Sequence, residues 1–214
     1  MLFLRSRDKH TGYKTLYWKW RNHDTIQSYW NERNHPSNKY LRDVLANISF
    51  DSLLEIGCSC GNKLFNVAQV NKNAKIVGID INYNAVSKGN LWLNQEGILN
   101  VDLQRGNIEN LSEFKDKSYD VVLSWATLIY VRPNKILGVL KDLIRIASRK
   151  IILFKMHKDG CNRGLWCHPG NWKRDYYKLF KEIGIQEESI RIEFLGKNIW
   201  DPGGGDASFL EIKL

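Results

Sequence analysis

The sequence contains no apolar run long enough to cross a membrane. The longest runs, such as Val121 to Leu123 and Ile151 to Phe154, are far shorter than the roughly 20 residues that a spanning helix needs. Arg5 places a charge before the apolar region of a secretion signal could form. Internal repeats and low-complexity tracts are also missing. We therefore expect a soluble, cytoplasmic chain without membrane partners.

Cysteine is scarce, with four residues in 214. Cys167 precedes His168, and Cys58 and Cys60 form a closely spaced pair, an arrangement that zinc ligands can have. Cys58 and Cys60, however, lie in a glycine-containing turn where small residues are needed anyway. We therefore expect reduced, packed cysteines and no metal site.

The length and composition are those of one globular domain. A chain of 214 residues with 43% hydrophobic content can bury a substantial core. Its net charge of +9 is concentrated in residues 1–50, which hold nine Lys/Arg against four Asp/Glu. Such a basic segment can attract the phosphates of nucleic acid, or it can be a solvated surface. Both interpretations stay open, and we expect residues 1–50 to form an N-terminal arm and cap on a domain of residues 51–214.

The stretch from Leu53 to Asn62 organises the rest of the chain. Its first residues are an apolar run that predicts a buried strand, and Gly57 and Gly61 then bracket a tight turn. From Lys63 to Val70 the apolar spacing suits a helix. A strand, a glycine turn and a helix form the nucleotide-binding start of a doubly wound sheet.

Asp80 indicates what kind of nucleotide-like ligand the predicted sheet binds. It ends a second apolar run, Ile76 to Ile79, where the next parallel strand should finish, and its carboxylate can accept hydrogen bonds from ribose hydroxyls there. Neither Gly-x-Gly-x-x-Gly nor Gly-Lys-Ser/Thr is present, which weakens a dinucleotide or P-loop interpretation. A ligand with a ribose but no pyrophosphate fits the pattern better.

Four motifs in order give the chain its resemblance to the class I S-adenosylmethionine-dependent methyltransferases. They are Glu55-Ile-Gly-Cys-Ser-Cys-Gly61, Gly78-Ile-Asp80, Arg105-Gly-Asn107-Ile108 and Tyr119-Asp120-Val-Val-Leu-Ser124. Ser59 replaces the usual middle glycine, and Asn107 replaces the usual aspartate, although its side-chain oxygen can still accept a hydrogen bond from an adenine amino group.

The resemblance implies S-adenosylmethionine as methyl donor and S-adenosylhomocysteine as product. It nominates the following residues for cofactor binding: Glu55, Gly57, Cys58, Ser59, Gly61, Asp80, Ile81, Asn107, Ile108, Ser124 and Trp125. Trp30 and Arg33 lie in the helix that we expect to begin at Asp24. They are further candidates for closing over the methionine end of the cofactor. Alternatively, Trp30 packs against the sheet and Arg33 faces solvent.

The resemblance also implies the fold: an α/β, doubly wound, mostly parallel seven-stranded sheet of order 3-2-1-4-5-7-6. Strand 7 would be antiparallel, helices would cover both faces, and a helical cap would precede the sheet. Asp24 to Gln27 has the spacing of a capping box for a first cap helix, and Ser37 can cap a second. The later pattern predicts a helix over Asn134 to Ala147, a loop over Lys158 to Gly170, and a helix over Trp172 to Ile183.

Methyl transfer from a sulfonium needs alignment and water exclusion, and a base only when the acceptor must lose a proton. His157 and Tyr130 follow the strands that face the methyl group, so they are the catalytic candidates. Either residue could instead be structural. The aromatic set Trp166, His168, Trp172, Tyr176 and Trp200 could wall an acceptor pocket or belong to the core.

The fourth motif continues as Ser124-Trp-Ala-Thr, which lacks the Asn-Pro-Pro-Tyr signature for base amines and the Pro-Cys pair for cytosine C5. We therefore expect methyl transfer to a hydroxyl or amine of a small molecule. An RNA or DNA methyltransferase that uses the basic arm, and a non-catalytic binding protein of the same fold, remain as alternatives. The oligomeric state stays open.

Overall fold

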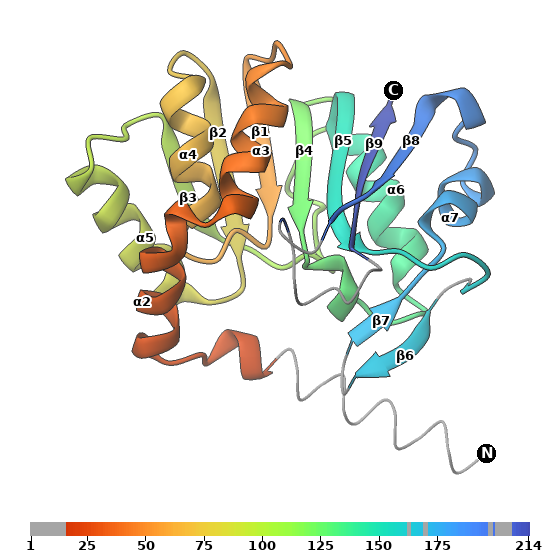
Figure 1. Cartoon of the computed structure of the whole chain (residues 1–214), viewed down its shortest axis with the longest axis horizontal. Coiled ribbons are helices and arrows are strands. Elements are labelled where there is room, and N and C mark those ends of the chain that lie inside the picture. Colours follow the sequence, from red (N-terminus) through yellow and green to blue (C-terminus); the bar gives the residue numbers. More distant parts are fainter. Residues whose placement is uncertain (1–15, 162–163, 169–170, 197–198, 200–206) are drawn as a thin grey trace.

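A computed structural model describes residues 16–161, 164–168, 171–196, 199 and 207–214. Seven strands form one sheet in the order β3-β2-β1-β4-β5-β9-β8, and a separate two-stranded sheet contains β6 and β7 (Figure 1). β9 is antiparallel to both of its neighbours, whereas the other pairings in the large sheet are parallel. The expected order, with its antiparallel final strand, is confirmed.

Strands β1, β2 and β4 follow apolar runs of the sequence closely. The bounds of all the strands are β1 Ser52–Ile56, β2 Lys75–Asp80, β3 Val101–Arg105, β4 Tyr119–Trp125, β5 Ala147–Met156, β6 Leu165–His168, β7 Asn171–Lys173, β8 Ile190–Phe194 and β9 Ala207–Lys213. The helices are α2 His23–Asn31, α3 Pro36–Ala46, α4 Asn62–Val70, α5 Tyr83–Gln95, α6 Ile136–Ile146 and α7 Tyr176–Glu182. Residues 16–19 add a helical turn before α2.

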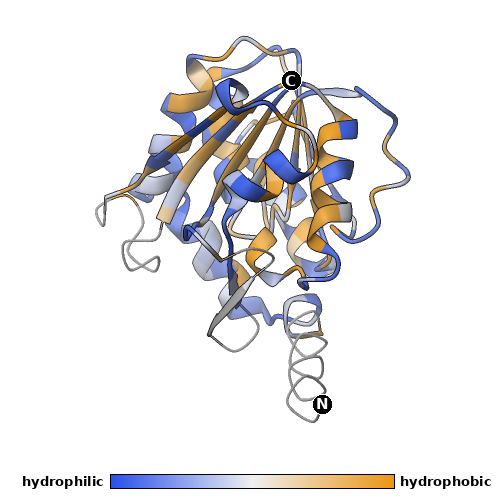
Figure 2. Ribbon diagram, turned by 90° about the vertical axis from the view of Figure 1, so that its right-hand side faces the viewer, coloured by the Kyte–Doolittle hydropathy of each residue, from blue (hydrophilic) through white to orange (hydrophobic). Residues whose placement is uncertain are grey.

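Two hydrophobic clusters divide the core between the faces of the sheet. Leu53 packs with residues of α2, α3, α4 and α5, and Leu54 packs with residues of α6 and α7. Neighbouring strand residues point to opposite faces, so the apolar pairs of β1 supply both clusters. Figure 2 shows these apolar strands lying between helices whose polar positions face outward. Since Ile26 of α2 and Leu41 of α3 are both buried in the first cluster, the two cap helices share the core of the sheet.

The cap helices begin at other residues than the capping motifs predict. Asn22 caps α2, because its Oδ1 accepts the Thr25 N–H at 3.2 Å. His35 caps α3 and is followed by Pro36 in the first turn, where a missing N–H costs nothing. The predicted N-caps Asp24 and Ser37 are therefore wrong, since both lie inside the first turns.

The C-terminal half differs from the prediction in one element. Residues 165–168 and 171–173 form the β6–β7 hairpin, in a region where we expected a loop and the start of a helix. Helix α7 begins later, because Asp175 caps it by accepting the Lys178 N–H at 3.0 Å. Of the aromatic set, Trp172 and Tyr176 are buried, and Trp200 lies outside the described residues. No described helix is long and apolar enough to cross a membrane.

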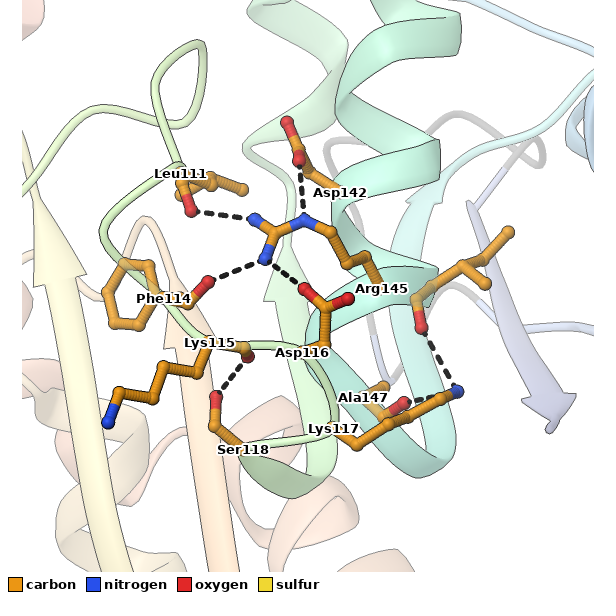
Figure 3. A network of polar contacts seen from close by, with 10 residues as sticks. Leu111, Phe114, Lys115, Asp116, Lys117, Ser118, Asp142, Arg145 and Ala147 are labelled. Atoms are coloured by element: carbon orange, nitrogen blue, oxygen red, sulfur yellow. Dashed lines mark hydrogen bonds and ion pairs between the residues drawn. The ribbon is translucent and has the colours of Figure 1, made fainter.

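Arg145 of α6 fixes the long connection between β3 and β4. Figure 3 shows its guanidinium between the helix and the connection: it donates to the Leu111 carbonyl at 2.9 Å and to the Phe114 carbonyl, and it pairs with Asp116 at 2.9 Å. Asp142, one turn earlier on α6, holds the Nε of Arg145 at 3.1 Å. The connection that follows Asn107 is thereby attached to the sheet.

Candidate active site

A cavity of about 450 Å³ lies at the carboxyl ends of the parallel strands. This is within the usual range for a small-molecule site, and its position is where open α/β sheets bind ligands. The described residues that line it come from five places: the glycine turn with α4, the ends of β2 and β3, the segment after β4, the cap, and β7. They include Gly57, Ser59, Asp80, Asn107, Trp125, Tyr130, Trp18, Arg21 and Tyr29.

The glycine turn is built on left-handed backbone. Gly57 has a φ of 83° and Gly61 a φ of 71°, and Ser59 between them adopts 53°. A side chain at Gly57 would also collide with Thr127, which follows β4. Serine takes the left-handed conformation at a cost of about 1–2 kcal/mol, so the turn keeps its shape although the middle glycine is missing.

Asp80 ties the end of β2 to this turn. One carboxylate oxygen accepts the Ser59 N–H at 2.9 Å, and the other accepts the Asn82 N–H at 2.8 Å. Burial raises the pKa of Asp80, and these two hydrogen bonds oppose the rise. Each carboxylate oxygen has a second acceptor position. Asp80 can therefore hold the turn and accept hydrogen bonds from a ligand at the same time.

Asn107 occupies the corresponding place after β3. Its Oδ1 accepts the Glu109 N–H at 3.0 Å, which shapes the loop that carries Ile108 along the cavity. An amide oxygen has two acceptor positions, so one remains for a ligand.

Residues 49–184, more than half of the chain, match a family model described as a methyltransferase domain. The chain belongs to this methyltransferase family. Membership confirms the resemblance that the four motifs indicated, and with it S-adenosylmethionine as the methyl donor of the family. A search of curated proteins found no match to the chain.

Solved structures share the fold of this methyltransferase at low sequence identity. An O-methyltransferase family protein from Burkholderia thailandensis matches with a TM-score of 0.62 and 12% identity, covering 82% of this chain and 55% of its own. A SAM-dependent methyltransferase from Aquifex aeolicus matches with a TM-score of 0.62 and 17% identity, covering 89% and 96%. PigF, in a structure with SAH, matches with a TM-score of 0.68 and 14% identity, covering 94% and 62%. The chain thus spans about half the length of the Burkholderia protein.

Several residues nominated for the cofactor lie behind the cavity of the methyltransferase and not on its surface. Cys58 and Ser124 are buried, and the Ser124 hydroxyl donates to the Ile56 carbonyl at 3.1 Å. The lining includes Gly57, Ser59, Asp80, Ile81, Asn107, Ile108 and Trp125, but not Glu55, Cys58, Gly61 or Ser124. These four residues shape the turn and the strand ends from inside.

Trp30 and Arg33 also lie outside the lining. Trp30 is buried and stacks on Trp92, with ring centroids 5.4 Å apart, and it meets Phe65 edge to face. Arg33 pairs with Glu96 at 3.1 Å and donates to the Trp30 carbonyl. The structure therefore places both residues in the packing of the cap against α4 and α5, and it does not bring them to the cofactor region.

Glu55 is fully buried, and neither of its carboxylate oxygens has a hydrogen-bond partner among the described residues. Burial raises its pKa to about 7; the nearby charge of Lys63 opposes this rise, and that of Asp80 adds to it. Near neutral pH this carboxyl is therefore divided between its protonated and ionised forms.

His157 is not positioned as a base for a substrate in the cavity. The side chain is buried and absent from the lining, and its Nδ1 accepts the Tyr176 N–H at 3.3 Å. The neutral ring must then carry its proton on Nε2, which lies 3.0 Å from Asp159 Oδ1. Burial, with the charge of Lys155, lowers the pKa of His157. Both ring nitrogens thus have partners within the protein, and the catalytic role of His157 stays a prediction.

The hydrogen bonds around His157 also bear on whether a metal ion could bind there. His157, Asp159 and Asp175 place one ligand atom each within 4.8 Å of one another. The two Asp175 oxygens already accept the Gly160 and Lys178 N–H groups, and the Nε2 of His157 carries the proton. Elsewhere, burial raises the pKa of Cys60 to about 11, which disfavours the thiolate that zinc requires.

Tyr130, the other catalytic candidate, does line the cavity. It lies in the 3-10 turn Leu128–Tyr130 after β4, and its ring packs on Trp18 of the cap with centroids 5.1 Å apart. Burial raises its pKa, with Arg21 opposing the rise. The phenol is therefore neutral at neutral pH and can donate a hydrogen bond.

The sequence analysis did not assign the cap residues that reach the cavity. Trp18, Arg21, Ile26 and Tyr29 line it, together with Lys63 of α4 and Asn171 of β7. The mixed aromatic and basic composition of residues 13–21 was the available signal. It has no helical period, so the sequence does not show which way these side chains point.

Proposed function

We propose that the chain transfers a methyl group from S-adenosylmethionine to a hydroxyl or amine of a small molecule. One observation carries this proposal. A single cavity joins the glycine turn and Asp80 to a group of aromatic rings from Trp18, Tyr29 and Tyr130. A nucleoside region and an aromatic-walled region are thus continuous, as transfer between a donor and a flat organic acceptor requires.

The residues present fit the donor. Asp80 would accept hydrogen bonds from the ribose, and Asn107 and Ile108 would border the adenine. Asn62 Oδ1 is a buried acceptor on a lining residue and has no hydrogen-bond partner in the described part of the chain. An ammonium group would satisfy it, and Lys63 beside it could pair with a carboxylate, so the two suit the amino-acid end of the donor.

When bound, S-adenosylmethionine supplies an electrophilic methyl group on a sulfonium. The chain contributes alignment and the exclusion of water. The contact between Trp18 and Tyr130 joins the cap to the segment after β4 at the wall of the cavity. Trp125 stacks on Phe154 with centroids 4.0 Å apart, which gives the end of β4 a rigid apolar surface.

The groups that line the cavity offer little general-base chemistry. Asp80 accepts two backbone N–H groups, Glu109 pairs with Arg132 at 3.4 Å, and the neutral Tyr130 is a donor. This arrangement suits an acceptor that reacts through an amine lone pair or through a hydroxyl that is already acidic.

The motif after β4 supports a small acceptor, because it lacks the base-amine and cytosine signatures. Of the nine Lys/Arg in the basic segment on which the nucleic-acid alternative depends, four lie in residues 1–15, outside the described part of the chain. No described feature favours that alternative.

A methyl-transfer assay on fractionated extract tests the proposal, with nuclease-treated and untreated material side by side. We expect labelled product of low molecular mass that survives nuclease. Asp80→Asn should weaken S-adenosylhomocysteine binding by about tenfold or more, since a hydrogen bond to a charged group contributes about 1.5–3 kcal/mol. Asp102→Asn, on the exposed part of β3, should leave it unchanged. Product that disappears with nuclease would favour the nucleic-acid alternative, and donor binding without turnover on any fraction would favour a binding protein.

A further inference from the structure

Arg21 of the cap lies in a box of aromatic rings at the cavity. The centre of its guanidinium is 4.6 Å from the Trp18 ring centroid, 5.0 Å from that of Tyr17 and 5.3 Å from that of Tyr29. Three rings attract the cation and hold it in one place. The guanidinium is half-buried and belongs to the lining of the cavity.

This cation has no acidic counterpart among the described residues. None of their ion pairs includes Arg21, and its buried Nε has no hydrogen-bond partner there. Aromatic faces attract the charge, but they do not replace the oxygen acceptors that five N–H groups require. A buried guanidinium N–H without an acceptor is unfavourable, so the position of this group on a cavity points to a ligand that supplies an acceptor.

Arg33 shows how the same cap treats an arginine away from the cavity. Its guanidinium also lies over two rings, 5.1 Å from Trp30 and 5.5 Å from Phe65. It nevertheless has a carboxylate partner, Glu96, at 3.1 Å, and a backbone carbonyl. Both arginines have similar aromatic surroundings, and each has a buried Nε without a hydrogen-bond partner among the described residues. They differ because Arg21 lacks an acidic partner there and lies at the cavity.

The other charged groups of the cavity do not account for Arg21. Asp80 and Glu109 are engaged by backbone N–H groups and by Arg132, respectively. The donor brings one carboxylate, and Lys63, in the first turn after the glycine turn, stands beside Asn62 to receive it. Arg21 instead lies beside Tyr29, with its charge acting on Tyr130, in the aromatic part of the cavity.

We propose that Arg21 selects an acceptor that carries an acidic oxygen group, a carboxylate or a phosphate, attached to a flat apolar part. The planar fork of arginine pairs with such groups through two hydrogen bonds. The rings of Trp18, Tyr29 and Tyr130 would cover the flat part. This inference rests on the proposed methyl transfer, whose acceptor it narrows to small aromatic acids or phosphate esters.

Ligand titrations of the full chain test this selection, with and without saturating S-adenosylhomocysteine. The probes are benzoate, phenyl phosphate and the neutral benzamide, followed by tryptophan fluorescence and NMR. We expect at least one anionic probe to bind tenfold or more tightly than benzamide. Arg21→Gln should abolish that preference, and Arg21→Lys should retain part of it. The preferred anion identifies the group as carboxylate or phosphate.

Arg33→Gln is the matched control, because it removes an equally aromatic-bound cation outside the cavity. It should leave the preference for the anion intact, and an equal loss in both variants would overturn the proposal. So would a parent protein that binds all three probes alike. If Arg21→Gln instead weakened S-adenosylhomocysteine tenfold, Arg21 would hold the donor and the proposal would again fail. A parent that prefers the anion through Arg21 but binds no S-adenosylhomocysteine would refute the proposed function and not this inference.

Discussion

Glu55 stands at the base of the cofactor turn as a buried carboxyl without a hydrogen-bond partner in the described part of the chain. Its pKa of about 7 in the folded protein exceeds the ordinary value of 4.5. Below pH 4.5 both the folded and the unfolded states hold the proton. As the pH rises from there to 7 the unfolded state loses its proton first, so the free energy of unfolding falls, and above pH 7 the full cost is present.

We predict that Glu55→Gln stabilises the protein at pH 8 by up to about 3 kcal/mol, the equivalent of the pKa difference. It should have little effect near pH 4.5, where glutamate and glutamine are both neutral. Urea unfolding at the two pH values measures the difference, with the exposed Glu113→Gln as a control. A gain of the same size at both values would show that ionisation of Glu55 does not cause it.

Some site residues could be predicted individually and others could not. Gly57 and Asp80 were predictable because each directly follows an apolar run, and Asn107 was predictable from the third motif; a strand end in a parallel sheet fixes where such a residue lies. His157 also follows a strand, but the Tyr176 N–H, 19 positions later in the chain, occupies its ring nitrogen. No local pattern reveals such a distant partner.

At the scale of elements, the Arg145 contacts in Figure 3 join α6 to the connection between β3 and β4. We predict that Arg145→Ala lowers the free energy of unfolding by about 2 kcal/mol, because two partly buried carbonyl groups would lose a charged donor. Denaturant unfolding measures this effect. Arg42→Ala, which removes an exposed pair with Asp43, should cost less than about 0.5 kcal/mol. If both variants lost a similar amount of unfolding free energy, Arg145 would not attach the connection between β3 and β4 more strongly than an exposed ion pair does.

Helices and strands with a regular apolar pattern of their own were predictable from the sequence. Those that depend on contacts with distant parts of the chain were not. The strands that end at Ile56 and Asp80 match the prediction because a buried parallel strand needs a continuous apolar run. The β6–β7 hairpin has no such run, and β7 lies against the turn that follows β4. The start of α2 was ambiguous locally, since Asn22 and Asp24 are both good caps and only one can begin the helix.

At the scale of the whole molecule, the cap has a part inside the core and a part over the cavity. Leu41 and Leu45 of α3 are fully buried, whereas Trp18, Arg21 and Tyr29 line the cavity. We predict that S-adenosylhomocysteine increases hydrogen-exchange protection across residues 16–30 and changes residues 36–46 little, because segments over a site order when it fills. Exchange measured by mass spectrometry with and without the ligand tests this. If hydrogen-exchange protection over residues 16–30 did not change, this part of the cap would be rigid and would not order when the ligand binds.

The side chain of Asn82 holds main-chain carbonyl groups of the cap. Its amide group donates to the Trp18 carbonyl at 3.0 Å and to the Arg21 carbonyl at 3.4 Å, so the attachment does not depend on which side chains occupy positions 18 and 21. The residues at these two positions, which line the cavity, can therefore be exchanged while the backbone stays tethered. A library randomised at these two codons should retain mostly folded, donor-binding proteins. Selecting it on new acceptors should yield variants with different substrate specificities.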